Sequence, residues 1–316
     1  MFLLIIEPGK KNMDIIFLGT SAAMPTLSRW PSAIAVFREG EVLLFDCGEG
    51  TQVQYTKAGL RPGKLSRIFI SHFHGDHVYG LIGLLTTMQL NGRDTPLHLY
   101  GPEGLQDYLK YMERLSHFTF RYKIEFYEVR ASSDKTVWDC GEYSITAMPL
   151  EHRIFTLGYR LEEKPKPGKF NITEAERLDI PDGPERGLLM RGQAIILADG
   201  TQVKPEQIIG PPRAGKKLAI CMDTMPCANA VNLALEADVL IHEGTFEESK
   251  SEWAFETGHS TVKQAAEIAK NASAKQLILT HISARYENRD TEKLLEQAKT
   301  IFPETTIAFD LLKYNL

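Results

Sequence analysis

The chain has 316 residues, a formal net charge of −5 and a sequence pI near 6.0. This acidic balance argues against general attachment to a nucleic-acid backbone, although it leaves room for a local basic patch. Hydrophobic residues make up 43% and charged residues 24%, which is typical of a globular enzyme with a sizeable core. Four scattered cysteines without a Cys-x-x-Cys spacing argue against thiolate zinc sites and favour reduced thiols.

The first twelve residues stand apart from the rest of the sequence. Met1–Ile6 is apolar but too short for a signal peptide or a membrane span, and a charged segment follows it at once. We expect residues 1–12 to be an appended or mis-started segment before a single domain over 13–316. No later stretch approaches ~18 apolar residues, so the sequence predicts a cytoplasmic protein with no membrane partner.

In chain order, short apolar runs separated by glycine-rich turns predict strands and helices. The first half predicts strands over 14–18, 32–37, 41–45, 67–70 and 97–100, and helices over 51–58, 78–90 and 103–115. Residues 123–149 return to strands. Further strands near Ile241, 277–279 and 307–309 alternate with helices over 227–236, 261–271 and 290–300. This order predicts an α/β fold (α+β by some schemes), in which helices cover the outside of a sandwich of two sheets.

One segment, residues 162–212, does not fit this alternation. It is rich in proline, glycine and charge and contains few core-forming runs. A stretch of ~50 residues without periodicity is more often a functional insertion or an arm than a packed element.

Four metal-ligand side chains occur within six residues, directly after an apolar strand. His72 and His74 lie two residues apart, so their imidazoles share a side of an extended segment. Gly75 then allows a tight turn before Asp76 and His77. A lone surface histidine would predict nothing, but this cluster predicts a metal-binding loop.

Three more ligand-type residues, His152, Asp223 and His281, also follow predicted strands. Each alone could be an ordinary core or surface residue, but their shared position predicts delivery to one sheet edge. With the loop they make seven candidate ligands, more than one tetrahedral zinc holds. We therefore predict two ions bridged by a carboxylate such as Asp223. Imidazole and carboxylate without thiolate suit Zn²⁺, with Mn²⁺ and Co²⁺ as alternatives.

Two further residues suggest chemistry at phosphorus. Glu243 ends a predicted strand, and His259 stands at the start of a predicted helix, where free N–H groups favour a phosphate. A charged His259 could stabilise a phosphate or protonate a leaving oxygen, with Glu243 fixing its tautomer. The alternative is a helix-start histidine exposed to water. His98 and His117 lack such a setting and are expected to be structural.

The segment Ser71–His77 resembles the His-x-His-x-Asp-His signature of the metallo-β-lactamase superfamily. Other segments follow in the order found in short-form ribonuclease Z: residues 17–25, 44–51, the His152 site, 223–224, 242–245, 258–261 and 279–286. The resemblance covers residues 13–316. Gly-His-Ser-Thr at 258–261 and Thr-His-Ile-Ser-Ala-Arg-Tyr at 280–286 narrow it from the superfamily to this branch.

The resemblance implies a metallo-β-lactamase fold, an αββα sandwich whose two sheets are mixed, and a zinc-dependent endoribonuclease. Such an enzyme cuts precursor tRNA just after the discriminator nucleotide and leaves a 3′-hydroxyl. One zinc ion would be held by His72, His74 and His152, and the other by Asp76, His77 and His281. Asp223 would bridge the two ions.

The same resemblance implies the roles of the remaining residues and the partners. Asp76 would help to activate water, and His259 with Glu243 would serve proton transfer. The 162–212 segment would be an arm that grips the body of the tRNA, and family members are typically homodimers.

Two features depart from the family pattern. The loop after the first strand keeps Pro25 and Arg29 of a Pro-x-Lys-x-Arg-Asn pattern but lacks its lysine and asparagine, which puts sensing of the tRNA CCA end in doubt. We still expect Arg29 to contact substrate. Residues 160–191 carry seven basic and seven acidic side chains. RNA contact is therefore expected from a local cluster: Lys164, Lys166 and Lys169.

Two other functions stay open. The chain could hydrolyse a small ester or phosphodiester with the same metals, but such a substrate does not need a long arm. It could instead be an RNA-binding protein on a degenerate hydrolase fold, although no ligand position has been lost.

Overall fold

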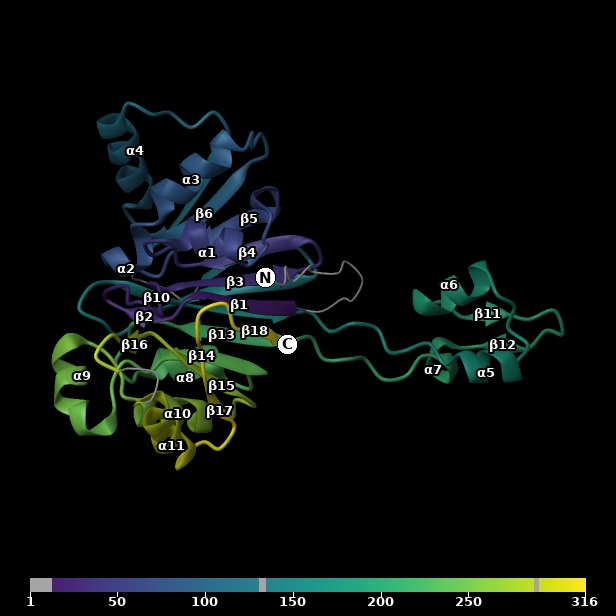
Figure 1. Ribbon diagram of the computed structural model, residues 1–316. Helices are drawn as coiled ribbons and strands as arrows, with labels where there is room; N and C mark the ends of the chain where they lie inside the picture. Colours follow the sequence, from purple (N-terminus) through teal and green to yellow (C-terminus); the bar gives the residue numbers. More distant parts are fainter. Residues whose placement is uncertain (1–12, 131–134, 287–289) are drawn as a thin grey trace. The chain divides into compact units, whose positions relative to one another are not determined.

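The computed structural model describes residues 13–130, 135–286 and 290–316, so the predicted appended segment over 1–12 lies outside the described residues. The chain separates into two compact units. The main unit consists of the described parts of residues 1–139, 145–161 and 217–316, and the insertion unit of residues 140–144 and 162–216. Figure 1 shows both units.

The first sheet of the main unit has seven strands among the described residues. Their spatial order is β18 (Lys313–Asn315), β1 (Met13–Gly19), β3 (Ala33–Arg38), β4 (Glu41–Phe45), β5 (Leu65–Phe69), β6 (Leu97–Pro102) and β7 (Ile124–Val129). The pairs from β18 to β4 are antiparallel, and those from β4 to β7 are parallel. The sheet is therefore mixed, as predicted.

Helices α1 (Thr51–Lys57), α3 (Leu81–Leu90) and α4 (Leu105–Ser116) lie on the outer side of this sheet (Figure 1). The helix predicted over 78–90 is divided in the structure, because α2 (Gly75–Val78) ends before α3 begins. Gly80 stands at the break and packs against the main chain of Gly48. A Cβ added at Gly80 would lie 2.0 Å from the Gly48 oxygen, so this close approach requires glycine.

The second sheet also has seven strands among the described residues. Their order is β17 (Thr305–Ile307), β15 (Leu277–Thr280), β14 (Val239–Glu243), β13 (Lys217–Cys221), β10 (Thr156–Glu163), β9 (Tyr143–Leu150) and β8 (Lys135–Asp139). The pairs from β13 to β17 are parallel. Helices α8 (Ala228–Ala234), α10 (Val262–Asn271) and α11 (Asp290–Lys299) cover its outer side (Figure 1).

The inner faces of the two sheets meet through aromatic side chains. The rings of Phe45 and Phe69 stack at 4.8 Å, and Tyr159 of the second sheet packs against both. The Tyr159 hydroxyl donates a hydrogen bond of 2.6 Å to the Ile70 carbonyl, which satisfies its polar atom in the core. The layers confirm the predicted sandwich, although the strand over 156–163 was not predicted.

Short elements complete the main unit around the ends of these strands. They are β2 (Ser21–Ala22), β16 (Ile282–Ser283), the 3₁₀ helices η1 (Pro62–Lys64) and η2 (Glu248–Lys250), and helix α9 (Ser251–Thr257). Strands β4 and β5 run parallel, and so do β13, β14 and β15. Parallel strands bring their carboxyl ends to one edge of a sheet, which is where α/β folds place their ligands.

The insertion unit has a small core of its own. Its elements are α5 (Ile172–Arg177), α6 (Pro184–Met190), β11 (Ile195–Ile196), β12 (Gln202–Val203) and α7 (Pro205–Ile208). Six buried apolar residues hold them together: Ala175, Ile180, Leu189, Ile195, Val203 and Ile208. The two ends of the insertion pair with each other, since the Glu163 amide donates to the Lys216 carbonyl at 2.9 Å.

The sequence predicts no membrane-spanning segment. Within the described ranges, none of the helices is long and apolar enough to cross a membrane.

Candidate two-metal active site

The seven predicted metal ligands come together at the carboxyl ends of strands from both sheets. The loop 72–77 follows β5, His152 follows β9, Asp223 follows β13, and His281 follows β15. Their side-chain atoms form two groups, each of which lies within 4.8 Å. The structure thus brings the predicted side chains together, although the strands that deliver them belong to two sheets and not to one.

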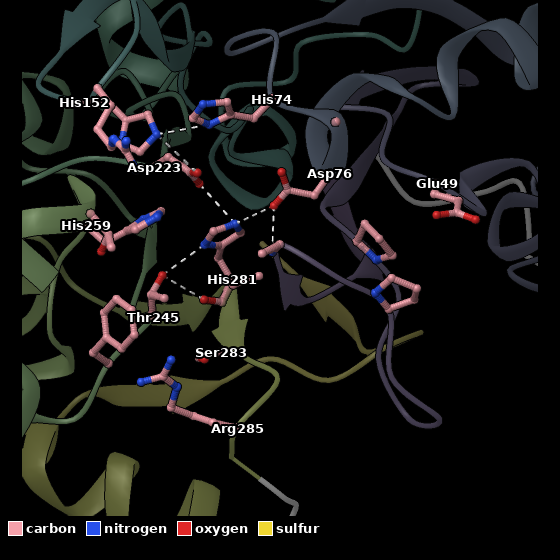
Figure 2. A pocket seen from close by; sticks show the side chains of 18 of the residues that line it. Glu49, His74, Asp76, His152, Asp223, Thr245, His259, His281, Ser283 and Arg285 are labelled. Atoms are coloured by element: carbon pink, nitrogen blue, oxygen red, sulfur yellow. Dashed lines mark hydrogen bonds and ion pairs between the residues drawn. The ribbon is translucent and has the colours of Figure 1, made fainter. Parts of the chain in front are cut away.

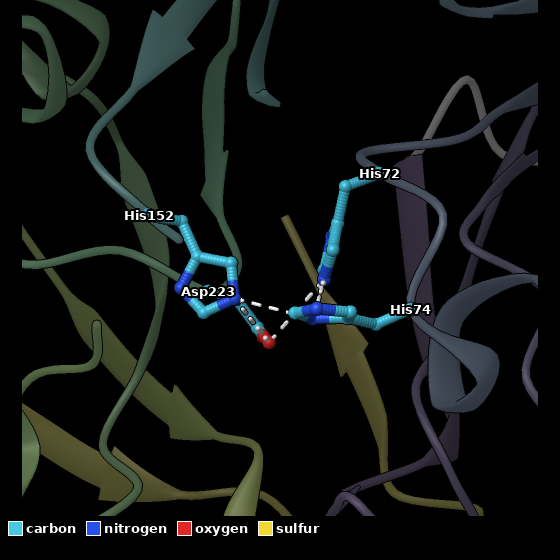
Figure 3. Close-up of side chains that lie close together, drawn as sticks. All are labelled: His72, His74, His152 and Asp223. Carbon is cyan, nitrogen blue, oxygen red and sulfur yellow. Dashed lines mark hydrogen bonds and ion pairs between the residues drawn. The ribbon is translucent and has the colours of Figure 1, made fainter. Parts of the chain in front are cut away.

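The first group consists of three histidines and one oxygen of Asp223 (Figure 3). His74 Nδ1 lies 3.0 Å from His72 Nε2 and 3.2 Å from His152 Nε2. Asp223 Oδ2 lies 3.5 Å from His72 Nε2 and 3.8 Å from His152 Nε2. Four ligand atoms around one small space fit a tetrahedral metal ion.

The second group consists of Asp76, His77, His281 and the other oxygen of Asp223. Asp223 Oδ1 lies 3.1 Å from Nε2 of both His77 and His281. Asp76 Oδ2 lies 3.2 Å from His281 Nε2 and 3.5 Å from His77 Nε2. The two oxygens of Asp223 thus face different groups, which is the arrangement of a bridging carboxylate.

Four of the histidines are fixed by hydrogen bonds at the ring nitrogen that points away from these groups. The contacts are His72 Nδ1 to Ser71 Oγ at 2.9 Å, His77 Nδ1 to Asp46 Oδ2 at 2.7 Å, His152 Nδ1 to the Gly258 carbonyl at 2.6 Å, and His281 Nδ1 to Thr245 Oγ1 at 3.0 Å. Ser71 Oγ itself donates to Asp46, and Thr245 Oγ1 donates to Glu243, so both accept from the ring. Each ring therefore carries its proton at Nδ1.

The Nδ1 protons determine which ring atoms are available to metal ions. With Nδ1 protonated, each Nε2 points a lone pair into a space shared with other lone pairs and with carboxylate oxygens. Asp223 is 2% exposed, and its Oδ1 has no hydrogen-bond partner among the described residues. Buried lone pairs without donors are costly unless a cation neutralises them, so the donor set fits two divalent ions.

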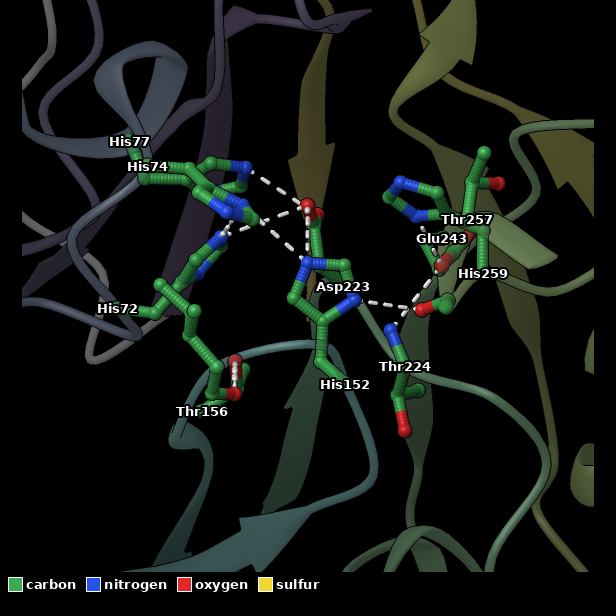
Figure 4. Close-up of polar contacts among 12 residues, drawn as sticks. His72, His74, His77, His152, Thr156, Asp223, Thr224, Glu243, Thr257 and His259 are labelled. Atoms are coloured by element: carbon green, nitrogen blue, oxygen red, sulfur yellow. Dashed lines mark hydrogen bonds and ion pairs between the residues drawn. The ribbon is translucent and has the colours of Figure 1, made fainter. Parts of the chain in front are cut away.

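Glu243 and His259 form a third group beside the second one (Figure 4). His259 Nδ1 lies 2.8 Å from Glu243 Oε1. Glu243 is fully buried and also accepts from the amides of Thr224 and Thr245. Burial lowers the pKa of His259, but the charge of Glu243 and the hydrogen bond to it raise it to about 9. His259 is therefore protonated, and its Nε2–H remains available to donate to a ligand.

The groups line one cavity of about 600 Å³, shown in Figure 2. His74, Asp76, His259 and Asp223 contribute to its wall, together with aromatic and apolar side chains. A cavity of this size accommodates more than a single small group. The arrangement can therefore bring a phosphodiester of a larger molecule to the metal ligands and to His259.

Comparison with known proteins places the chain in a family. It is 43% identical to the protein named Ribonuclease Z of Picosynechococcus sp., over 96% of both chains. It is also 43% identical to the Ribonuclease Z of a Nostoc species, over 96% of this chain and 95% of the relative. The chain belongs to the ribonuclease Z family. A model described as anti-Pycsar protein Apyc1 matches residues 13–166, which is less than half of the chain.

Solved structures agree with this ribonuclease Z assignment. The crystal structure of human tRNase Z, short form, has a TM-score of 0.71 and 31% identity, and covers 95% of this chain and 98% of its own. The metallo-β-lactamase fold protein YhfI from Bacillus subtilis has a TM-score of 0.68 at 19% identity, over 97% of this chain and 100% of its own. The predicted family, fold and enzyme class, an endoribonuclease that uses divalent metal ions, are thereby confirmed.

The structure gives Arg29 a role different from the predicted contact with substrate. Arg29 is 6% exposed, and its Nη1 donates to Thr20 Oγ1 at 2.6 Å and to the Ala308 carbonyl at 2.8 Å. A guanidinium that is buried and bonded in this way supports the loop after β1. This loop reaches the site through the Ala23 amide, which donates to Asp76 Oδ2 at 2.8 Å.

The three lysines predicted to bind substrate lie in the insertion unit of this ribonuclease Z. Lys164 and Lys169 are exposed, and Lys166 is partly buried. Lys166 Nζ lies 3.1 Å from Glu163 Oε2, so part of its charge is neutralised within the unit. The three side chains therefore differ in what they can offer to RNA, and their role stays a prediction.

Sequence reasoning missed the residues that hold the ligands from behind, above all Asp46. Its carboxylate accepts from His77 Nδ1, from the Ser71 amide at 2.7 Å and from Ser71 Oγ at 2.9 Å. Asp46 directly follows β4, so the signal that identified Asp223, a carboxylate at a strand end, was present for it too. It also adopts a φ of 58°, which aspartate tolerates better than most residues.

Proposed function

We propose that this ribonuclease Z cleaves the 3′ trailer from precursor tRNA just after the discriminator nucleotide and leaves a 3′-hydroxyl. The observation that carries the proposal is Asp223, whose two oxygens face two separate ligand groups 3.1 to 3.8 Å away. A two-metal centre suits in-line displacement at phosphorus. The similarity to human tRNase Z supports tRNA as the substrate.

We assign two Zn²⁺ ions per chain to the site. His72, His74 and His152 would hold one ion, and Asp76, His77 and His281 the other, with Asp223 between them. Imidazole and carboxylate ligands suit zinc, although Mn²⁺ and Co²⁺ accept the same donors. When bound, such ions lower the pKa of water toward ~7 and stabilise charge on the attacking and leaving oxygens.

Asp76 Oδ2 has the position of a proton acceptor for the attacking water. It lies beside His77 and His281 at the cavity wall, and the Ala23 amide fixes its orientation. A carboxylate in this position is ionised at neutral pH and can accept a proton from the attacking water.

His259 has the position of a proton donor on the other side of the reaction. Its Nδ1–H donates to Glu243, which leaves Nε2–H to donate toward the cavity. Because the cut leaves a 3′-hydroxyl on the tRNA, the leaving atom is the 3′-oxygen of the discriminator nucleotide. His259 would give this oxygen its proton, and Glu243 would stabilise the charged ring.

The proposal includes the remaining partners. We assign binding of the tRNA body to the insertion unit, with Lys164 and Lys169 as its exposed cations. The family resemblance further supports a homodimer. We also propose that the protein acts in the cytoplasm. Sedimentation of the purified protein checks the homodimer, and fractionation of the source cells checks the cytoplasmic location.

The decisive experiment is cleavage of a precursor tRNA transcript with a 3′ trailer, measured beside bis(p-nitrophenyl) phosphate. We expect one cut after the discriminator nucleotide, a 3′-hydroxyl on the tRNA and two zinc ions per chain by elemental analysis. Hydrolysis of the small diester without cleavage of the transcript would contradict the proposed substrate. Less than one ion per chain at neutral pH, with no cleavage, would contradict the enzyme.

A further inference from the structure

An aromatic surface that the mechanism does not use lies in the wall of the active-site cavity. Phe246, from the loop after β14, and Trp253 of α9 both line the cavity. Their rings are stacked with centroids 6.1 Å apart and planes 23° apart. Phe246 is buried, at 4% exposure, whereas Trp253 remains 44% exposed. Trp253 therefore offers an accessible aromatic face to a ligand in the active-site cavity.

The guanidinium of Arg285, just after β16, lies over these rings. Its guanidinium carbon is 4.0 Å from the Trp253 ring centroid and 5.1 Å from that of Phe246. Across residues 13–130, 135–286 and 290–316, Arg285 has no hydrogen bond or ion pair with another side chain. Arginine stacked on an aromatic face keeps its plane fixed and its N–H groups available. We call Phe246, Trp253 and Arg285 the stacking shelf.

The stacking shelf is contiguous with the group that we assign to proton transfer. The Phe246 ring lies 6.0 Å from the His259 ring, and Trp253 lies one ring further away. Figure 2 shows Arg285 and His259 at the wall of the same cavity. A phosphate beside His259 would thus place the base of a neighbouring nucleotide, several ångströms away, within reach of the shelf.

Resting on the proposed function, we propose that the stacking shelf binds the nucleobase of a nucleotide that flanks the scissile phosphate. Single-stranded RNA is recognised by stacking of unpaired bases on aromatic rings and on guanidinium planes. Such stacking tolerates any base, because every base has a flat π-face. The shelf would therefore orient the substrate without reading its sequence, and Trp253 and Arg285 are positioning residues for the cut.

The alternative for Arg285 alone is a phosphate contact, in which only its charge matters. The observed geometry favours stacking, because a lysine would serve a phosphate without needing Trp253 behind it. The two readings differ in their response to Arg285→Lys, which keeps the charge but removes the plane.

A double-mutant cycle tests the proposal with full-length enzyme and three precursor tRNA transcripts. One transcript is intact, one is abasic at the discriminator nucleotide, and one is abasic at the first trailer nucleotide. We expect Trp253→Ala to lower kcat/KM about 10-fold on the intact transcript. On the transcript that lacks the stacked base, the same substitution should cost less than about 2-fold, because the partner is already absent.

Phe255→Ala is the matched control, because Phe255 lies on the same helix and is 73% exposed. It should leave cleavage of all three transcripts unchanged. Zinc content and thermal unfolding establish that each variant is folded, and Trp253→Phe should recover most of the activity. Arg285→Lys should behave like Trp253→Ala.

Equal losses from Trp253→Ala on all three transcripts would overturn the stacking shelf. So would normal activity of Arg285→Lys together with a loss in Arg285→Ala, which is the signature of a phosphate contact. Failure of the unaltered enzyme to cut any transcript would instead contradict the proposed function, so the two failures are distinguishable.

Discussion

In the metal centre, His72 and His77 are fully buried and Asp223 is 2% exposed, whereas in the insertion unit Lys164 and Lys169 stand in solvent. The ligands of the centre follow strands of the two large sheets, and hydrogen bonds behind four of the histidines fix their orientation. The insertion unit has a core of only six buried apolar residues, and its longest helix has seven residues. One region is rigid and preorganised, and the other is a small surface module.

This difference fits our proposal that chemistry and affinity for tRNA reside in separate parts of the chain. A preorganised site works because its groups do not have to reorient during the reaction. Exposed lysines instead contribute affinity that salt screens and that falls as counterions compete. Substitutions in the two regions should therefore change different measured quantities.

The largest expected effect comes from Asp76→Ala. The variant loses a metal ligand and the assigned proton acceptor, so kcat should fall by at least about 10³-fold. Binding of precursor tRNA, measured by gel shift, should change less than about 3-fold, because we assign it to the insertion unit. A large loss of tRNA affinity would contradict this separation, since it would show that the metal centre also holds the body of the substrate.

Glu243→Gln should lower kcat by about 100-fold and change its pH dependence. His259 is protonated below its pKa of about 9 and loses its proton as the pH rises through that value. Removal of the Glu243 charge lowers this pKa, so the alkaline limb of the kcat profile should move to lower pH. Glu296→Gln, an exposed carboxylate on α11, is the control. An unmoved alkaline limb would remove His259 from the reaction.

Asp46→Asn tests a residue that sequence reasoning did not identify. Asparagine tolerates the φ of 58° but accepts less strongly from His77 Nδ1, so zinc affinity should fall about 10- to 100-fold. Zinc retained after dialysis against a chelator measures the effect, and excess zinc should restore activity. Unchanged zinc retention would mean that Asp46 supports the fold and not the metal.

These two regions also differ in what the sequence could predict. The metal ligands could be predicted because each follows an apolar run that is visible in the sequence, as at His152 and His281. Asp46 also follows a strand, so its position was marked, but its partner His77 could be identified only from the fold. The role of Thr245 was not visible, because a hydroxyl behind a ligand needs the fold to show its partner. The burial of Arg29 was missed for the same reason, since Ala308 lies 279 residues away in sequence.

In the insertion unit the sequence was less informative. Its helices have four to seven residues, so no hydrophobic period could develop over 162–212. The core residues, such as Ile180 and Val203, are spaced irregularly because they come from turns and two-residue strands. Hydrophobic periodicity identifies only long helices and strands, so it does not identify a core that is assembled from short ones.

The smallest expected effect comes from replacing residues 165–214 with a short glycine linker. The Glu163 amide and the Lys216 carbonyl are hydrogen bonded at 2.9 Å, so the linker has little distance to span. We expect KM for precursor tRNA to rise about 10-fold and its dependence on salt to weaken, because phosphate contacts are lost.

Hydrolysis of bis(p-nitrophenyl) phosphate and zinc content should stay within about 2-fold, since the metal ligands all lie in the main unit. The double variant Lys164→Ala and Lys169→Ala, with the core of the insertion intact, should reproduce part of the rise in KM. Equal losses on tRNA and on the small diester would show that the insertion supports the fold of the metal centre, and affinity and chemistry would then not be separable.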